Sequence, residues 1–182
     1  MSDQDPVTID IVSDVVCPWC YLGKSNLEKA LQDYGDPVII RWHPFQLDPT
    51  IPREAQGLKF DFEAIEKSPN TLDAHRLIQW AGENGTQDQI VDALFKAYFE
   101  QGRDIGDPSV LIEIATAHGF VKSEIEKKLM GDDDITSVRA EIEEAQRLGI
   151  SGVPFFIFNR KLAASGAQPP DQLLAAIKQA QA

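Results

Sequence analysis

The stretch DVVCPWCYLG, residues 14–23, holds both cysteines of this chain. They are Cys17 and Cys20, and Pro18 and Trp19 lie between them. Two thiols at this spacing can close a small disulfide ring, supply half of a metal site, or pack in a core as small apolar side chains. The residues on either side decide which of these the pattern favours.

The cysteine pair lies at a predicted junction between a strand and a helix. Residues 7–14 alternate apolar and polar side chains, which is typical of a strand. Residues 17–34 have apolar side chains at helical spacing, with Pro18 in the first turn and Gly35 after the last. A second strand is predicted at 38–42. This order is a βαβ unit.

The middle of the chain predicts only helices, and the strand pattern returns near the end. The helices have start and stop signals and apolar stripes, and they fall within residues 68–85, 86–102, 107–119, 122–131 and 134–149. Residues 153–158 and 162–164 predict a hairpin, and the last segment predicts a closing helix. The sequence therefore predicts an α/β protein with a block of helices inserted between its second and third strands.

Charge and composition exclude several classes of partner. The chain has 182 residues and a formal net charge of −12. Binding to nucleic acid or to an anionic membrane surface would need compensating cations. No apolar run approaches the roughly 20 residues that cross a bilayer. The acidic, polar N-terminus lacks the pattern of a secretory signal. We therefore expect a cytoplasmic protein with neither nucleic acid nor membrane as partner.

The position of the two thiols suggests different roles for them. The free N–H groups and the positive dipole end of a helix favour a thiolate at Cys17. Cys20, one turn further on, can reach back to close the disulfide. We therefore expect Cys17 to be the accessible, acidic nucleophile and Cys20 the shielded, resolving thiol. A C-x-x-C pair beside a βαβ unit in a cytosolic chain is typical of thiol–disulfide exchange.

Two other interpretations of the cysteines remain open from the residues alone. Zinc usually takes four ligands, often from a second pair at close spacing, but His43, His75 and His118 are isolated in the sequence. No metal is therefore expected. Two buried structural cysteines are the other interpretation. Elsewhere, His75 and Arg76 are expected to serve helix packing and surface pairing, and His43 to be a turn residue.

Several motifs together resemble the DsbA-like branch of the thioredoxin superfamily. They are DVVCPWCYLG, RWHPFQLDP, NTLDAHRL, GISGVPFFIF and SGAQPP, spread in this order from residue 14 to residue 170. The match is closest to FrnE-type proteins and to 2-hydroxychromene-2-carboxylate isomerases and kappa-class glutathione transferases. The resemblance implies a thioredoxin fold, at 1–44 and 146–182, with an all-helical insertion domain at 45–145.

The resemblance also implies a substrate-binding surface around the cysteines. In this superfamily a cis proline precedes the third strand and faces the C-x-x-C pair. By position it is Pro154, and the backbone of Val153 would pair with an extended substrate. The helix that begins at Asn70 or Thr71 would face the active site. The full set of expected substrate-binding residues is Pro18, Trp19, Val153, Pro154, Asn70, Thr71 and Ser165.

Departures from the family pattern favour redox chemistry. The glutathione-dependent relatives are expected to have serine where this chain has Cys17. They also carry an Asp-Arg pair in the turn that here reads from Ser165 to Pro169. The buried carboxylate of thioredoxins falls on Ile11, so Asp14 or a water would carry the proton of the resolving thiol. No second cysteine pair follows, which implies an external oxidant or reductant.

The sequence therefore predicts a DsbA-like thiol–disulfide oxidoreductase without a bound cofactor. Its substrates would be protein or low-molecular-weight thiols and disulfides, with glutathione as a candidate co-substrate. One alternative is a glutathione-dependent isomerase or transferase of the kappa-class type. A second is a noncatalytic binding or chaperone module with a vestigial motif. The sequence leaves a homodimer open.

Overall fold

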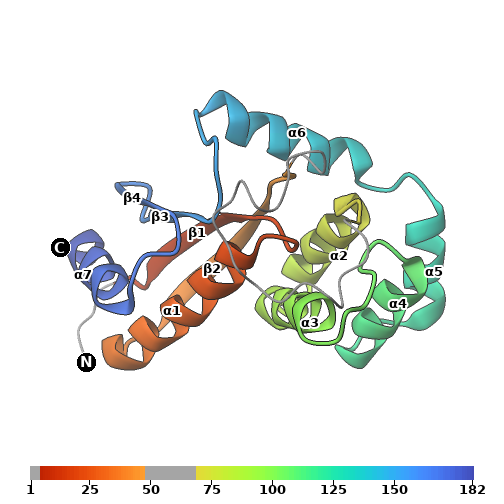
Figure 1. Ribbon diagram of the computed structural model, residues 1–182, viewed down its shortest axis with the longest axis horizontal. Coiled ribbons are helices and arrows are strands. Elements are labelled where there is room, and N and C mark those ends of the chain that lie inside the picture. Colours follow the sequence, from red (N-terminus) through yellow and green to blue (C-terminus); the bar gives the residue numbers. More distant parts are fainter. Residues whose placement is uncertain (1–4, 48–68) are drawn as a thin grey trace. The chain divides into compact units, whose positions relative to one another are not determined.

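The computed structural model describes residues 5–47 and 69–182 and divides into two compact units (Figure 1). The thioredoxin-like unit comprises Met1–Phe45 and Glu141–Ala182, and the helical unit comprises Gln46–Ala140. The last two residues of the RWHPFQLDP motif lie outside the described residues.

The thioredoxin-like unit contains a four-stranded mixed sheet. Its strands follow the order β2-β1-β3-β4, with β1 parallel to β2, β3 antiparallel to β1 and β4 antiparallel to β3. The elements are β1 (Val7–Ser13), α1 (Pro18–Tyr34), β2 (Val38–Pro44), β3 (Phe155–Phe158), β4 (Leu162–Ser165) and α7 (Pro170–Gln181). The predicted βαβ unit, hairpin and closing helix are confirmed.

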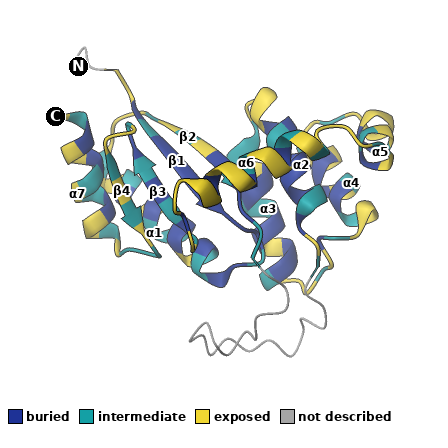
Figure 2. Cartoon of the chain, turned by 90° about the horizontal axis from the view of Figure 1, so that it is seen from above, coloured by how far each residue is buried: buried dark blue, intermediate teal, exposed yellow. Residues whose placement is uncertain are grey.

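Strand β1 is the most deeply buried strand of this sheet, as the dark colour in Figure 2 shows. Ile9 and Ile11 are fully buried, and Asp10 and Val12, which point to the opposite face, are also buried. A strand that is paired on both sides and covered on both faces is held firmly in place. The loop that follows β1 therefore starts from a rigid element, and this loop leads to Cys17.

Helix α1 packs against α7, and both contribute apolar side chains to the core of the thioredoxin-like unit (Figure 1). Leu27 and Ala30 of α1 and Leu173 and Ile177 of α7 are buried. Gly35 ends α1 in the left-handed conformation, at φ 79°, and its N–H donates to the carbonyl of Leu31. Glycine adopts this conformation without the steric cost of a Cβ atom.

The turn of the β3–β4 hairpin also joins the two ends of the unit. Asn159 and Arg160 have positive φ angles of 48° and 55°, as a two-residue hairpin turn requires. The Asn159 side chain accepts a hydrogen bond from the Thr8 N–H at 2.8 Å and donates one to the Ala180 carbonyl at 2.9 Å. One turn residue thus ties β1, the hairpin and α7 together.

Five helices follow one another from residue 72 to residue 147, as predicted. They are α2 (Leu72–Glu83), α3 (Gln87–Phe99), α4 (Pro108–Ala117), α5 (Lys122–Met130) and α6 (Ile135–Arg147). Asp107 caps α4 through its carboxylate, which accepts from the Ser109 N–H at 2.8 Å. The two units divide within α6, between Ala140 and Glu141, and the boundary predicted at 145–146 lies in the same helix.

A buried arginine organises the helical unit. Arg76 is 1% exposed, so the prediction that it pairs at the surface is wrong. Its guanidinium donates to Asp73 Oδ1 at 2.8 Å and lies 5.1 Å from the Trp80 ring. It also donates to three backbone carbonyls at 2.7–2.8 Å, those of Lys128, Gly131 and Asp133. These carbonyls lie in the last turn of α5 and in the segment that joins α5 to α6, where backbone carbonyls leave the helical hydrogen-bond pattern.

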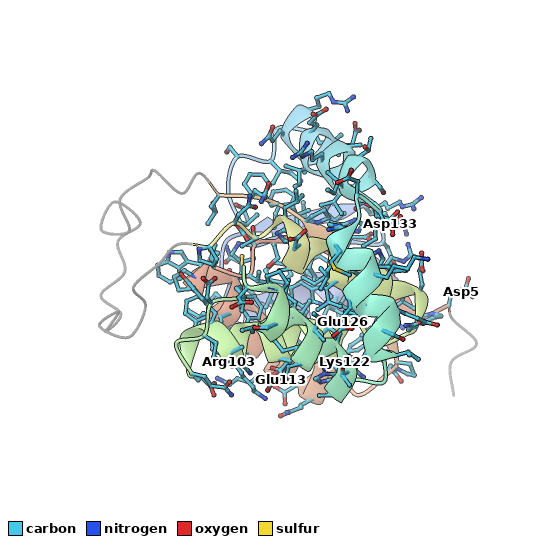
Figure 3. All side chains as sticks on the ribbon, turned by 90° about the vertical axis from the view of Figure 1, so that its right-hand side faces the viewer. Asp5, Arg103, Glu113, Lys122, Glu126 and Asp133 are labelled. Carbon is cyan, nitrogen blue, oxygen red and sulfur yellow. The ribbon has the colours of Figure 1, made fainter. Side chains whose placement is uncertain are left out.

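A second arginine pair lies at the surface of the same unit. Arg103 and Glu113 form a two-pronged ion pair, with nitrogen–oxygen distances of 3.1 and 2.6 Å (Figure 3). The Glu113 side chain is 68% exposed. This pair offers a solvent-exposed counterpart to the buried arginine.

No helix within residues 5–47 and 69–182 is long and apolar enough to span a membrane.

Candidate functional site

Cys17 occupies the N-terminal cap of α1. Its backbone is extended, at φ −88° and ψ 113°, and Pro18 is the first helical residue. The Cys17 N–H donates to the Asp14 carbonyl at 3.0 Å, and the Cys17 carbonyl accepts from the N–H groups of Cys20 and Tyr21. These bonds fix the turn between β1 and α1. They place the Cys17 sulfur beside the backbone N–H groups of Trp19 and Cys20, in the first turn of the helix.

The surroundings of Cys17 favour its thiolate. The pKa of Cys17 is lowered, and the largest cause is a hydrogen bond from the Cys20 side chain. Burial opposes this effect, and the N–H groups of Cys20 and Trp19 add to it. The nearby charge of Asp14 raises the pKa. The hydrogen-bond donors around the Cys17 sulfur therefore lower its pKa by more than burial and the Asp14 carboxylate raise it.

Cys20 has the opposite character. Its pKa is raised well above the ordinary value, first because burial disfavours its thiolate, and then because of its hydrogen bond to Cys17 and the charge of Cys17. The Ser13 side chain and the Asp14 backbone act in the lowering direction. Both cysteines are free thiols in this structure. The Cys20 thiol therefore donates a hydrogen bond to the Cys17 sulfur, and Cys17 is the cysteine that more readily becomes a thiolate.

Burial does not distinguish the two cysteines. Cys17 is 2% exposed and Cys20 is 1% exposed, so the prediction that Cys17 is accessible is wrong for this structure. The reason is that Cys17 caps the helix and has Cys20 on one side and Val153 on the other. The two thiols differ in acidity, while their exposure is the same.

The segment before β3 approaches the Cys17 sulfur. The Val153–Pro154 peptide bond is cis, as predicted. The Val153 carbonyl oxygen lies 3.6 Å from Cys17 Sγ, within reach of a weak hydrogen bond from the thiol. Val153 is half-buried and Pro154 is buried. Residues 136 positions apart in the chain therefore meet at one sulfur atom.

Gly23 of α1 makes room for this approach. A Cβ atom at position 23 would lie 2.9 Å from Cγ of Pro154 and 3.2 Å from Cζ of Phe156. Real Cβ atoms essentially never make contacts as short as 2.9 Å, and a contact of 3.2 Å is unusually tight. A side chain at this position would therefore push the proline away from the helix. Glycine inside a helix is otherwise unfavourable by roughly 1 kcal/mol relative to alanine.

The structure places the remaining predicted residues of the thioredoxin-like unit at different depths. Pro18 is buried and Trp19 is half-buried. Ser165 is exposed at the end of β4, where it pairs in register with Phe155. The N–H of Gly166, the next residue, donates to the Pro154 carbonyl at 2.8 Å. Ser165 thus lies one residue from a direct contact with the cis proline.

Asn70 and Thr71 belong to the helical unit, and their role in substrate binding stays a prediction. Asn70 Oδ1 accepts from the Leu72 N–H at 3.0 Å, while Thr71, the residue at the cap position of α2, makes no capping bond with its side chain. Gln46 Nε2 donates to Asn70 Oδ1 at 3.0 Å and approaches Thr71 Oγ1 at 3.4 Å. The capping role expected at this helix start therefore falls to Asn70.

His43 forms a small cluster with two carboxylates. Its Nε2 lies 2.9 Å from Asp10 Oδ1, and its Nδ1 lies 3.5 Å from Glu141 Oε2. The pKa of His43 is raised, first by the hydrogen bond to Glu141 and then, against burial, by Asp10. His43 was expected to be only a turn residue, and its sequence gave no sign of these distant partners. In the described part of the chain, no three His, Cys, Asp or Glu side chains are grouped as a metal site requires.

Sequence reasoning missed the local roles of Ser13 and Gly23. Ser13 is buried, at 4% exposure, and acts on Cys20. Ser13 is one of three polar residues in β1, with Thr8 and Asp10, so the sequence alone did not mark it. For Gly23, the signal was a glycine inside a predicted helix, which often marks a close approach of another segment.

The sheet order, the helical insertion and a thiol pair that faces a cis proline define a thioredoxin-fold protein with a dithiol at the start of its first helix. The DSBA-like thioredoxin domain family matches residues 8–178. The chain therefore belongs to this family.

Individual relatives agree with this assignment. The uncharacterized protein YwbO from Bacillus subtilis (strain 168) is 28% identical over 177 residues, which cover 83% of this chain and 86% of YwbO. The probable DsbA oxidoreductase SCO1869 from Streptomyces coelicolor is 30% identical, with a TM-score of 0.82 and coverage of 96% of this chain and 89% of that one.

More distant structures share the fold. The cytosolic disulfide reductase DsbM from Pseudomonas aeruginosa, solved with GSH, is 18% identical, with a TM-score of 0.71 and coverage of 94% of this chain and 98% of that one. A 2-hydroxychromene-2-carboxylate isomerase is also 18% identical, with a TM-score of 0.69, and the match covers 94% and 95% of the two chains. The fold alone therefore admits both oxidoreductases and isomerases.

Proposed function

We propose that this protein catalyses thiol–disulfide exchange through Cys17 and Cys20. The observation that carries this proposal is the opposed acidity of two adjacent thiols, with the pKa of Cys17 lowered and that of Cys20 raised. Cys17 therefore more readily forms the attacking thiolate, and Cys20 keeps its proton until it attacks the mixed disulfide.

The exchange has two steps in the reducing direction. The Cys17 thiolate attacks one sulfur of a substrate disulfide, the substrate S–S bond breaks, and one substrate thiolate leaves. Cys20 then loses its proton and attacks Cys17 Sγ. The mixed disulfide breaks, the second substrate thiolate leaves, and the Cys17–Cys20 disulfide closes. Two electrons pass to the substrate, and an external dithiol or two monothiols must restore the reduced pair. The oxidising direction reverses these steps.

The segment around Val153 supports a role in holding the substrate. Its carbonyl lies beside Cys17 Sγ, so an extended peptide whose disulfide reaches this sulfur would run alongside this backbone. Main-chain pairing of this kind is tolerant of side-chain identity. Pro18, Trp19, Pro154 and Ser165 would complete the surface, together with Asn70 and Thr71 of the helical unit.

Glutathione is the small thiol that we propose as a co-substrate. A disulfide reductase with the same fold was solved with GSH. In this chain, the backbone of Gln168 is held by Asn26 Nδ2 at 3.0 Å, and the Gln168 side chain donates to the Ser165 carbonyl. The turn at residues 165–169 contains no arginine. It therefore lacks the guanidinium that would bind a carboxylate through two parallel hydrogen bonds. We expect exchange with glutathione, and little conjugation of glutathione to electrophiles.

The location and assembly of the protein stay predictions. We place the activity in the cytoplasm, where an external reductant or oxidant would return the cysteine pair to its starting state. A homodimer is left open. A glutathione-dependent isomerase or transferase is the rival function on this fold, and a noncatalytic binding or chaperone module is the second rival.

Trapping variants test the proposed function. Cys20→Ser should accumulate mixed disulfides with a glutathione-linked or peptide disulfide, because the resolving thiol is missing, while Cys17→Ser should accumulate none. Mass spectrometry of the protein after quenching with acid measures both. Equal trapping by the two variants would contradict the two roles. Efficient glutathione conjugation that survives Cys17→Ser would favour the transferase instead.

A further inference from the structure

Asn26 joins helix α1 to the turn that follows β4. Its Nδ2 donates to the Gln168 carbonyl at 3.0 Å, and the two residues are 142 positions apart in the chain. Asparagine is a weaker helix former than alanine or leucine, while one hydrogen bond of this kind adds only modestly to stability. These effects oppose each other, so the free energy of folding gives little reason for asparagine at this half-buried position of the helix.

The turn that Asn26 holds is itself closely bonded. The Gln168 N–H donates to the Gly166 carbonyl at 2.9 Å, and the Gln168 side chain donates to the Ser165 carbonyl at 2.6 Å. Pro169 follows with φ at −60°, and a proline restricts both its own φ and the conformation of the residue before it. The turn therefore behaves as one rigid piece, and its position is set by the contacts at its two ends.

The same turn holds Pro154. The Gly166 N–H donates to the Pro154 carbonyl at 2.8 Å. Pro154 also packs closely against α1 at Gly23, where an added Cβ atom would lie 2.9 Å from Cγ of the proline. Gly23 and Asn26 are three positions apart and so lie on the same side of the helix. Helix α1 therefore meets the proline twice, directly at Gly23 and through the turn at Asn26.

Cys17 begins the helix that makes these two contacts. The Val153 carbonyl, which is bonded to the Pro154 nitrogen, lies 3.6 Å from Cys17 Sγ. A segment that touches α1 at one point could still turn about that contact, whereas two contacts fix both its distance and its direction. The direction matters because a displacement of about 1 Å at a reacting centre can slow a reaction by roughly 100-fold.

We propose that Asn26 is a positioning residue for thiol–disulfide exchange with extended peptides. Through the turn it holds the Val153–Pro154 segment in a fixed place beside α1, so that a peptide paired with the Val153 backbone brings its disulfide to Cys17 Sγ. Asn26 takes no part in the bonds that form and break. A small disulfide has no backbone to pair and depends on Asn26 much less. This inference rests on the proposed thiol–disulfide exchange.

The test compares two substrates on one set of variants. Asn26→Asp keeps the shape of the side chain and removes the donor, and Asn26→Leu removes the donor without adding a charge. Both variants should lower kcat/KM for an extended peptide disulfide roughly tenfold, the order of one lost hydrogen bond, and lower kcat/KM for hydroxyethyl disulfide less than about twofold. A loss of folded protein alone would lower both values by the same factor.

Asn159→Asp is the matched control in the same unit. Asn159 Nδ2 donates to the Ala180 carbonyl at 2.9 Å, and its Oδ1 accepts from the Thr8 N–H. Aspartate keeps the second bond and loses the first, so this variant should leave kcat/KM unchanged for both substrates, whatever its effect on thermal stability. The positioning role would be overturned if the Asn26 variants slowed neither substrate or both equally, or if Asn159→Asp slowed only the peptide.

A second measurement does not depend on turnover. The Val153 carbonyl can accept a weak hydrogen bond from the Cys17 thiol, and a bond made by the neutral thiol disfavours its thiolate. In a Cys20→Ser background, the ultraviolet absorbance of the Cys17 thiolate should therefore appear at lower pH after Asn26→Leu and at unchanged pH after Asn159→Asp.

This titration separates the two proposals. An unchanged Cys17 titration after Asn26→Leu would overturn the placement of the Val153–Pro154 segment by Asn26. A parent protein that exchanges neither disulfide would overturn the proposed function instead, while the titration would still report whether Asn26 holds the segment beside the Cys17 sulfur.

Discussion

Two buried polar clusters in this molecule, one in each unit, differ in how completely their groups are bonded. In the helical unit, Arg76 has a carboxylate, three carbonyls and an aromatic ring as partners. In the thioredoxin-like unit, the Ser13 hydroxyl has no hydrogen-bond partner within the described residues, and burial raises the pKa of Cys20. Arg76, Ser13 and Cys20 are all deeply buried, with exposures of 1–4%.

The difference fits a structural role for the Arg76 cluster and the reactive role that we propose for the cysteine cluster. A buried network whose groups are all bonded contributes stability and rigidity. A buried cluster that keeps two thiols of opposed acidity loses stability in the resting state, but it can stabilise charge that appears during a reaction. Degree of hydrogen bonding therefore distinguishes the two clusters where burial does not.

The largest effect should come from the arginine cluster. Arg76→Met removes a donor from three backbone carbonyls and the buried partner of Asp73, and we expect it to lower the free energy of unfolding by about 3–5 kcal/mol. This is a large share of the roughly 5–15 kcal/mol of a typical domain. Urea denaturation followed by tryptophan fluorescence measures it, since Trp80 lies beside the arginine.

Arg103→Met is the matched control for this change. It removes an arginine from an exposed two-pronged pair with Glu113 (Figure 3), and exposed pairs contribute little because water and salt screen them. We therefore expect a much smaller loss than for Arg76→Met. Equal losses for the two variants would mean that the buried network is not what stabilises the helical unit.

The next effect tests the close packing around the thiols. Gly23→Ala should destabilise the protein by about 1–3 kcal/mol, because the new methyl group meets Pro154 and Phe156 at contacts too short to keep. It should also slow disulfide exchange. The Val153 carbonyl, which lies beside Cys17, is bonded to the Pro154 nitrogen, so it would move with the proline. Thermal denaturation and an exchange assay on the same preparation measure both.

Gly82→Ala is the helical counterpart in the other unit. A Cβ atom there would meet only the Gln87 side chain, 3.2 Å away, whose amide donates to the Ile78 carbonyl and would need to shift by a few tenths of an ångström. Alanine is favoured over glycine inside a helix by up to about 1 kcal/mol. We therefore expect Gly82→Ala to be neutral or stabilising, with exchange unchanged. If both alanine variants behaved alike, the contact with Pro154 would not be the reason for Gly23.

The sequence predicted whatever depends on neighbours in the chain. Alternation and helical spacing located the strands and helices, and Asp107, Gly35 and Asn159 behave as their residue types predict. The C-x-x-C pair at a helix start was also visible, since the dipole and the free N–H groups belong to the same segment.

What the sequence could not predict depends on residues far apart in the chain. The burial of Arg76 follows from carbonyls more than 50 positions away, and the contact between Gly23 and Pro154 spans 131 positions. The burial of Cys17 likewise depends on Val153. The type of a side chain does not reveal which distant residues it will contact. An arginine, for example, can pair at a surface as well as in the interior.

The smallest effect should come from a third cluster, which is bonded and also partly open to water. His43 lies between Asp10 and Glu141, its side chain is 38% exposed, and its pKa is raised by these partners. Folding therefore favours the protonated imidazole. The resulting stability is fully present below the ordinary histidine pKa of about 6.5, and it is lost as pH rises through the raised pKa of the folded state.

We expect His43→Gln to flatten the pH dependence of the free energy of unfolding in this window, with a difference from the parent of under about 1 kcal/mol because the imidazole is screened by water. Glu141→Gln should remove the larger part of the same slope, since Glu141 is the main cause of the raised pKa of His43. Urea denaturation at several pH values from below 6.5 upward, in low and high salt, measures both. A parent protein that gains stability relative to His43→Gln as pH rises would contradict the sign. A slope that survives Glu141→Gln intact would instead assign the effect to Asp10, the partner in the same sheet. In that case the cluster would belong with the well-bonded structural type, because the Asp10 carboxylate is itself largely buried.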